Sequence, residues 1–201
     1  VINDLYNEGL RTLQIDDCTW GCLVDDDFIA SFIEKSDRDK EVIRREFAER
    51  FLNINNRVFQ NNPEDLVINT HVCRGNYAST WFGQGGYDKI ADELFGKEDV
   101  NAYYLEFDTE RAGTFESLAK VSGDKKVVLG LITSKNPTLE EKESVIARIK
   151  EASKYVPLDR LYLSPQCGFA STEEGNRLTE EEQWAKLRFI KEISDEVWGE
   201  N

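Results

Sequence analysis

The chain has 201 residues, of which 40% are hydrophobic and 11% aromatic, so it can bury a substantial core. Its formal net charge of −14 disfavours binding to nucleic acid or to anionic membranes, because both need clustered lysine and arginine. The sequence shows no apolar run that would span a bilayer, no signal segment, and no cysteine spacing typical of a disulfide framework. These features predict a cytoplasmic globular protein with reduced thiols.

Five strand-like runs alternate with helical patterns, which is typical of a parallel sheet with crossover helices. The runs cover residues 11–16, 66–74, 102–107, 126–133 and 160–167. The first intervening helix is expected from about Ser36 to Gln60, with an apolar stripe that lies on the sheet. Six residues form that stripe: Val42, Ile43, Phe47, Phe51, Ile54 and Val58. Shorter helices are expected over residues 87–95 and 115–121.

The sequence contains N-terminal capping signals for two later helices. Thr138 to Glu141 and Thr179 to Glu182 both match the capping box, in which a hydroxyl and a later carboxylate satisfy free backbone N–H groups. We expect these helices to reach about Val156 and Trp198. The acidic runs 25–27 and 180–182 are expected at exposed turns and helix starts.

The single histidine lies two residues before a cysteine in the second strand-like run. On an extended strand, His71 and Cys73 project from the same face, as two ligands of a metal site would. A protein zinc site needs three or four ligands, and Glu106 and Cys167 stand at the ends of two later runs. The pattern predicts a zinc site, and the alternative is a buried, hydrogen-bonded histidine beside a core cysteine.

Five β/α units with candidate ligands at the carboxyl ends of their strands predict a TIM barrel. A barrel needs eight strands, and five alone would leave two unpaired edges. We therefore expect residues 1–201 to be the C-terminal part of a TIM (β/α)8 barrel, a single domain with about three β/α units missing before Val1. The alternative is a complete, open, doubly wound sheet, but the glycines of 83–86 are not placed as a phosphate-binding loop.

Four short motifs together carry a family resemblance: Leu-Gln-Ile-Asp-Asp at 13–17, His-Val-Cys-Arg-Gly-Asn at 71–76, Tyr-Leu-Glu-Phe at 104–107 and Ser-Pro-Gln-Cys-Gly at 164–168. In this order they resemble the C-terminal catalytic barrel of the cobalamin-independent methionine synthase family, particularly its short, single-barrel members. The resemblance implies that His71, Cys73, Glu106 and Cys167 bind zinc. It also implies that Asp16 binds the ammonium group of homocysteine, whereas a carboxylate at a strand end otherwise often caps the next helix or pairs with a nearby arginine.

The implied reaction is transfer of a methyl group to the sulfur of a zinc-bound thiol. Two thiolates and one carboxylate give zinc an electron-rich shell, which favours thiol alkylation over hydrolysis. Methionine synthases carry a histidine after the seventh barrel strand as proton donor to the departing folate, but residues 131–137 contain none. Residues 169–172 also lack the family's basic residues. We therefore expect a methyl donor other than methyltetrahydrofolate.

Two alternatives for the function stay open at this point. One is a related zinc enzyme that opens an epoxide with a thiol, and the other is a non-catalytic scaffold with a structural zinc. Arg74, Asn76 and Trp81 follow the histidine and cysteine pair and are candidates for the mouth of the site. Arg111 is expected to form a solvated pair with Glu110. Cys18 and Cys22 are expected to be ordinary thiols.

Overall fold

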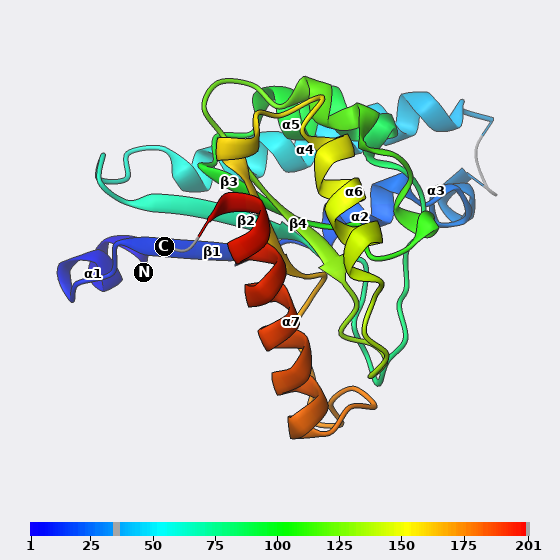
Figure 1. Cartoon of the computed structure of the whole chain (residues 1–201). Coiled ribbons are helices and arrows are strands. Elements are labelled where there is room, and N and C mark those ends of the chain that lie inside the picture. Colours follow the sequence, from blue (N-terminus) through cyan, green and yellow to red (C-terminus); the bar gives the residue numbers. More distant parts are fainter. Residues whose placement is uncertain (34–36, 200–201) are drawn as a thin grey trace.

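The computed structural model describes residues 1–33 and 37–199. Five strands form one parallel sheet in the order β1-β2-β3-β4-β5 (Figure 1). The strands are β1 Thr12–Asp16, β2 Val67–Val72, β3 Ala102–Glu106, β4 Lys126–Ile132 and β5 Leu161–Pro165. Each lies within its predicted run, so the predicted alternation of β/α units is confirmed.

The helices are α1 Ile2–Asn7, α2 Thr19–Val24, α3 Asp26–Ile33, α4 Lys40–Phe59, α5 Ala91–Lys97, α6 Lys142–Ala152 and α7 Glu180–Trp198. Short 3₁₀ helices cover Tyr87–Ile90, Glu110–Ala112, Phe115–Lys120 and Leu158–Arg160. The sequence reasoning missed α1, α2 and α3, because such short helices show little apolar periodicity. The helix expected over residues 115–121 is a 3₁₀ helix.

The long helix α4 is present but faces differently from the prediction. It begins after Asp39, whose carboxylate accepts from two backbone N–H groups, and the predicted start at Ser36 lies outside the described residues. Val42, Ile54 and Val58 of the predicted stripe are exposed. Ile43 of the stripe is buried, and Phe47 and Phe51 are partly buried against the core. Arg44, Ala48, Leu52 and Phe59 are buried as well. The stripe does not lie on the sheet as predicted, because α4 packs mainly on α2, α3 and α5.

The two predicted capping boxes have opposite outcomes. Thr179 caps α7, because its hydroxyl accepts from the Glu182 N–H at 3.2 Å and the Glu182 carboxylate accepts from the Thr179 N–H at 2.7 Å. The prediction for Thr138 is wrong, since α6 begins only at Lys142. The buried Lys186 donates from Nζ to the Thr138 carbonyl at 2.7 Å, which ties this segment to α7.

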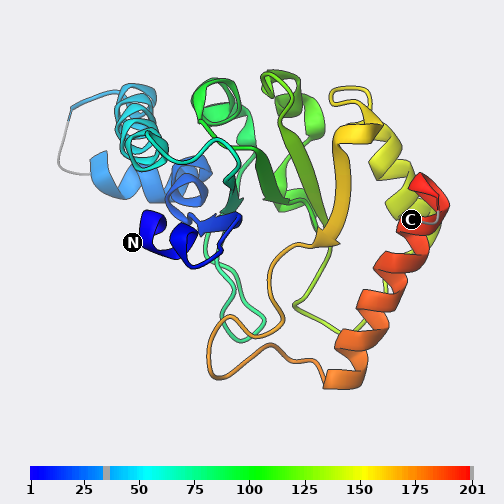
Figure 2. The ribbon, with the colours of Figure 1, turned by 90° about the vertical axis from the view of Figure 1, so that its left-hand side faces the viewer.

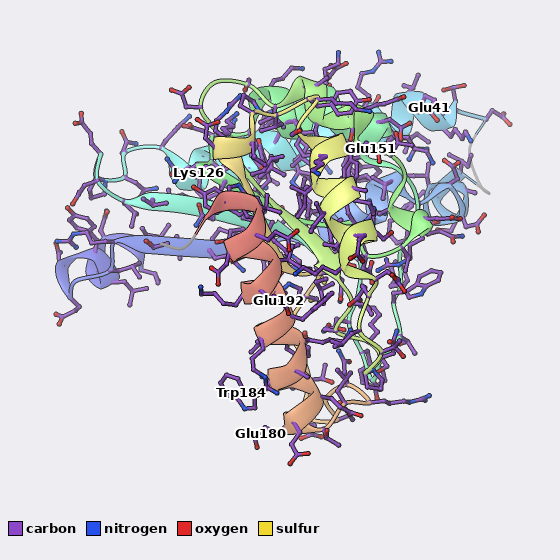
Figure 3. All side chains as sticks on the ribbon, in the orientation of Figure 1. Glu41, Lys126, Glu151, Glu180, Trp184 and Glu192 are labelled. Carbon is purple, nitrogen blue, oxygen red and sulfur yellow. The ribbon has the colours of Figure 1, made fainter. Side chains whose placement is uncertain are left out.

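Glu180 and Glu181 are exposed, as predicted, whereas Glu182 is half-buried, and Figure 3 shows Glu180 and Glu192 on the outside of α7. Asp25 contradicts the expectation for its run, because it is buried. Its carboxylate accepts from the N–H groups of Asp27 and Phe28 at the start of α3, and from the N–H of Gln84 at 2.9 Å. This carboxylate therefore fixes a loop as well as a helix start.

Helix α4 (cyan), α5 (green), the 3₁₀ helix Phe115–Lys120 (green) and α6 (yellow) follow one another along one face of the curved sheet in Figure 2. The opposite, inner face carries a cavity of about 510 Å³ between the N-terminal halves of the strands, lined by residues that include Val67, Tyr104 and Tyr162. This is the predicted fold class, five β/α units of a TIM barrel. The three further units expected before Val1 stay a prediction.

One polar cluster interrupts the apolar core behind the sheet. The Asn55 side-chain amide donates to the carboxylates of Glu98 at 2.7 Å and Asp17 at 2.8 Å, and the Trp20 indole donates to Glu98 at 3.3 Å. Glu98 is completely buried, and its second oxygen has no partner among the described residues. Burial raises the pKa of Glu98 from 4.5 to about 7. Within the described part of the chain, no helix is long and apolar enough to cross a membrane.

Candidate metal centre

Three of the four predicted ligands come together at the carboxyl ends of the strands. Among the described residues, His71, Cys73 and Cys167 form a group whose ligand atoms all lie within 4.8 Å of one another. The Cys167 Sγ and His71 Nε2 atoms are 3.5 Å apart. In tetrahedral zinc sites, bonds of about 2.1 Å to nitrogen and 2.3 Å to sulfur place two such ligands about 3.6 Å apart. The separation and the soft donors therefore fit zinc.

The backbone of the neighbouring strand orients the histidine ring. In the sheet register, His71 stands between Asp16 of β1 and Tyr104 of β3. The Nδ1 atom of His71 lies 3.2 Å from the Tyr104 carbonyl oxygen, which favours a proton on Nδ1 and leaves Nε2 as the free ligand atom. Nε2 also lies 3.8 Å from a carboxylate oxygen of Asp16. Asp16 thus adjoins the group, on its β1 side, and its side chain is exposed.

The two cysteines shift each other's pKa in opposite directions. The hydrogen bond from Cys73 lowers the pKa of Cys167, as does the contact with His71. The same hydrogen bond raises the pKa of Cys73, and burial adds to the rise. For His71, burial works to lower the pKa, but Cys167 and the carboxylates of Asp16 and Glu106 outweigh it, so the pKa is raised. The pocket concentrates negative charge, as a cation-binding site does.

Glu106 adjoins the three-residue group without belonging to it. Its carboxylate is completely buried and accepts from the Arg74 backbone N–H at 2.6 Å and from Arg111 at 2.7 Å. Burial raises the pKa of Glu106 although the Arg111 charge opposes the rise. Each carboxylate oxygen retains a second lone pair, so these contacts are compatible with metal ligation. Arg111 also pairs with Asp108 at 3.1 Å, so the expected solvated pair with Glu110 is wrong.

A network of amide side chains ties the loop after β2 to the loop after β5. The Asn76 amide donates to the Gly168 carbonyl and to the Ser171 hydroxyl, both at 2.7 Å. The Asn176 amide donates to Asn76 Oδ1 and to the Ser134 carbonyl, both at 2.9 Å. Figure 2 shows these two loops together below the strand ends. The network therefore fixes Cys73 and Cys167, which stand at the starts of the two loops.

Two glycines allow the backbone segments around the cysteines to approach each other. A Cβ atom at Gly21 would lie 2.3 Å from the Cys73 carbonyl oxygen. A Cβ atom at Gly130 would lie 2.6 Å from the Cα atom of Gln166, the residue before Cys167. Both distances are shorter than real Cβ contacts allow, so each position requires glycine for its neighbour to keep its place.

Of the three residues predicted for the mouth of the site, Arg74 and Asn76 are buried and Trp81 is exposed. The Arg74 side chain is buried over the Tyr87 ring, 4.3 Å from its centroid, and so points into the core and away from the mouth. Trp81 is 45% exposed at the rim. Reasoning from sequence missed Ser171 and Asn176, because their contacts join separate loops and leave no local pattern. It named Arg111 but gave it the wrong partner.

Comparisons of the sequence with known proteins point to one protein family. Residues 2–193 match the family model described as "Cobalamin-independent synthase, Catalytic domain". The chain is 46% identical over 198 residues to the uncharacterized protein YxjG of Bacillus subtilis, covering 98% of this chain and 51% of that protein. It is 28% identical over 103 residues to a methionine synthase of Pyrococcus horikoshii, covering 51% of this chain and 27% of that protein.

A solved structure is also similar over nearly the whole chain. It is the "Putative Vitamin-B12 Independent Methionine Synthase" of Listeria monocytogenes, with a TM-score of 0.73 and 38% identity. The match covers 99% of this chain and 52% of that one. The chain thus spans about half the length of the relatives that it matches from end to end.

Proposed function

We propose, from the premise that this chain belongs to the cobalamin-independent synthase family, that its site transfers a methyl group to the sulfur of homocysteine and depends on zinc. The observation that carries the proposal is the convergence of His71, Cys73 and Cys167 within 4.8 Å at the carboxyl ends of parallel strands. Relatives named methionine synthase support the reaction class. The expected family resemblance is confirmed by the family match.

Four side chains would hold the metal: His71 through Nε2, the two cysteines through sulfur, and Glu106 through a carboxylate oxygen. A bound zinc ion would lower the pKa of a substrate thiol so that its sulfur is a thiolate at neutral pH. Arg111 already holds one carboxylate oxygen of Glu106 and the Arg74 N–H holds the other, which keeps the carboxylate from turning away. A ligand set with two thiolates suits a nucleophilic sulfur, because it leaves the metal weakly electrophilic.

Asp16 is the residue that we propose for the ammonium group of the substrate. Its carboxylate is exposed and lies on the β1 side of His71, so a small amino acid can reach it while its sulfur faces the cysteines. In the transfer, the new sulfur–carbon bond forms as the bond from the donor to the methyl carbon breaks. The electron pair of the broken bond stays with the donor, and the thiol proton has already left the sulfur.

The donor is proposed to be a methyl carrier other than methyltetrahydrofolate. The loop after β4 brings Thr133, Ser134 and Lys135 to the rim, and the sequence has its single histidine in the metal group. A departing folate anion needs a proton, and a positioned acid typically contributes about 10² to 10⁴ in rate. A donor that leaves without a proton avoids this requirement.

Zinc-edge X-ray absorption with and without homocysteine tests the proposal. We expect one further sulfur ligand when homocysteine is added, because a catalytic site gains the substrate whereas a structural site keeps its shell. Cys73→Ser and Cys167→Ser are expected to lose stoichiometric zinc. Cys18→Ser is the matched control, since Cys18 is exposed and stands at the start of α2. Full zinc retention in both site variants, or an unchanged sulfur count, would refute the assignment.

A further inference from the structure

A second cavity lies at the carboxyl ends of the strands, on the side of Glu106 away from Asp16. Its volume is about 440 Å³, and the loops after β2, β3, β4 and β5 all contribute to its lining. We call it the Lys135 cavity, after the buried lysine in its wall. Trp81, Arg111, Lys135, Pro137 and Arg177 are among the residues that line it.

The charges of this cavity are unusual for such an acidic protein. Lys135 is only 9% exposed, and its Nζ atom donates to Asn76 Oδ1 at 3.2 Å, yet it forms no ion pair with any described residue. The Arg177 guanidinium also forms no ion pair within the described chain, although its backbone N–H is held by Ser79 Oγ at 2.7 Å. Arg111, by contrast, is neutralised by Glu106 and Asp108.

The Lys135 charge requires an explanation, because it is buried without an ion pair among the described residues and a buried charge is normally paired. The chain has 39 acidic and 25 basic residues, so a carboxylate partner would be easy to supply. An oxyanion of a bound ligand would supply a counter-ion for both Lys135 and Arg177. The 45% exposed Trp81 ring and Pro137 add an apolar wall for the rest of such a ligand.

The cavity borders the metal centre at two points. Arg111 forms part of its wall and also binds Glu106. Lys135 binds Asn76, whose amide binds the carbonyl of Gly168, the residue after Cys167. No residue of the loop after β1 is in the lining, so a thiol that occupies Asp16 lies on the other side of the centre. A ligand of the Lys135 cavity is therefore a different molecule from the thiol.

We propose that the Lys135 cavity binds an oxyanion, a carboxylate or a phosphate, of the methyl donor. This inference rests on the proposed function, because it takes the donor as the second substrate. It assigns Lys135 and Arg177 to the charged group of the donor and Trp81 to the adjoining apolar or planar part. Arg111 keeps its pairing with Glu106 and forms the wall between the two substrates.

Isothermal titration of the whole chain with inorganic phosphate, and separately with acetate, tests the binding site without any turnover. We expect saturable binding of at least one anion, and the stronger of the two identifies the preferred oxyanion. Lys135→Met and Arg177→Met should each weaken it by about tenfold or more, the scale of a lost charge-assisted contact. Lys126→Met is the control, since Lys126 lines the cavity on the inner sheet face.

Zinc content is measured on the same samples. Arg177 is exposed, so Arg177→Met should fold and bind zinc normally even if Lys135→Met disturbs Asn76. Absence of binding by both anions, or equal affinity in Arg177→Met and the control, would overturn the cavity assignment. One combination of results separates the two proposals. If Arg177→Met weakens anion binding but homocysteine adds no sulfur ligand to zinc, the proposed function and the donor assignment are refuted, and the cavity is an oxyanion site of another kind.

Steady-state kinetics test the link to the donor. With the methyl carrier that supports turnover, Arg177→Met should raise the KM for the donor by about tenfold and leave kcat and the KM for homocysteine nearly unchanged. An unchanged KM for the donor would overturn its assignment to this cavity. A rise in the KM for homocysteine alone would instead place the substrate carboxylate there.

Discussion

Replacing Glu98 with glutamine should change how the stability of the protein depends on pH. The Glu98 carboxyl is completely buried, and burial raises its pKa from 4.5 to about 7. Below pH 4.5 the group is protonated in both the folded and the unfolded chain, so its ionisation costs nothing. As the pH rises from 4.5 to about 7, the unfolded chain ionises while the folded chain keeps its proton, so stability is lost progressively over this range.

The size of the effect follows from the two pKa values. A difference of about 2.5 units, at about 1.36 kcal/mol per unit, corresponds to about 3 kcal/mol of stability lost between pH 4.5 and pH above 7. Glutamine has a similar shape and no charge to bury. Its oxygen can accept from the Asn55 amide and the Trp20 indole, as the Glu98 carboxylate does. Glu98→Gln should therefore be more stabilising at high pH than at low pH by this amount.

Urea unfolding followed by circular dichroism between about pH 4 and pH 8 measures the effect. The quantity of interest is the difference in unfolding free energy between the variant and the parent chain at each pH. Glu64→Gln, at an exposed position, corrects for the loss of one negative charge. If the curves for the parent and Glu98→Gln run parallel over this range, the reasoning from burial is wrong.

Three further predictions concern the site. Asp16→Asn should weaken homocysteine binding by about 1 to 3 kcal/mol in calorimetry while zinc content stays constant, and equal rates with homocysteine and a thiol lacking the amino group would contradict the role of Asp16. Gly130→Ala should destabilise the chain by about 1 to 3 kcal/mol and weaken zinc binding in a chelator competition, because the new Cβ meets the Gln166 backbone. Gly96→Ala is its control, since a Cβ there meets nothing within 4 Å, and similar zinc affinities in the two variants would argue against this contact. Methyltetrahydrofolate and its polyglutamate form should be poor donors beside methylcobalamin or S-methylmethionine in an assay of methionine production, and efficient turnover with either folate would show that another residue supplies the proton.

The parts of the fold that the sequence predicted are those set by local patterns. The strands of the sheet are long enough to show continuous β-branched and aromatic runs, so all five were found. The capping box at Thr179 was predicted because it acts within one helix turn. The same signal failed at Thr138, where the Glu140 carboxylate accepts from the Thr133 N–H at 2.8 Å and Lys186 holds the segment from α7. A contact from a distant helix overrode the local preference.

In the candidate site, too, the arrangement set by local patterns was predictable and the contacts between distant segments were not. The alternation of a strand predicts that His71 and Cys73 share a face, and parallel strands predict that Cys167 meets them at one rim. The partners of Glu106 were not predictable, since Arg111 reaches it from the loop after β3 and the Arg74 backbone reaches it from the loop after β2. The Asn76 and Asn176 amides meet across 100 residues of sequence, and asparagine in a loop gives no signal of such a partner.

The contact between His71 and the Tyr104 carbonyl has a consequence for mutational tolerance. The acceptor belongs to the main chain, so no substitution at position 104 can delete it while β2 and β3 stay in register. The amide network around Asn76 depends on side chains and has no such protection. In a library that randomises both positions, zinc binding should survive many residues at 104 and few at 76. The sheet backbone therefore keeps the His71 ring oriented under substitution, whereas the spacing of Cys73 and Cys167 depends on side chains that a single substitution can remove.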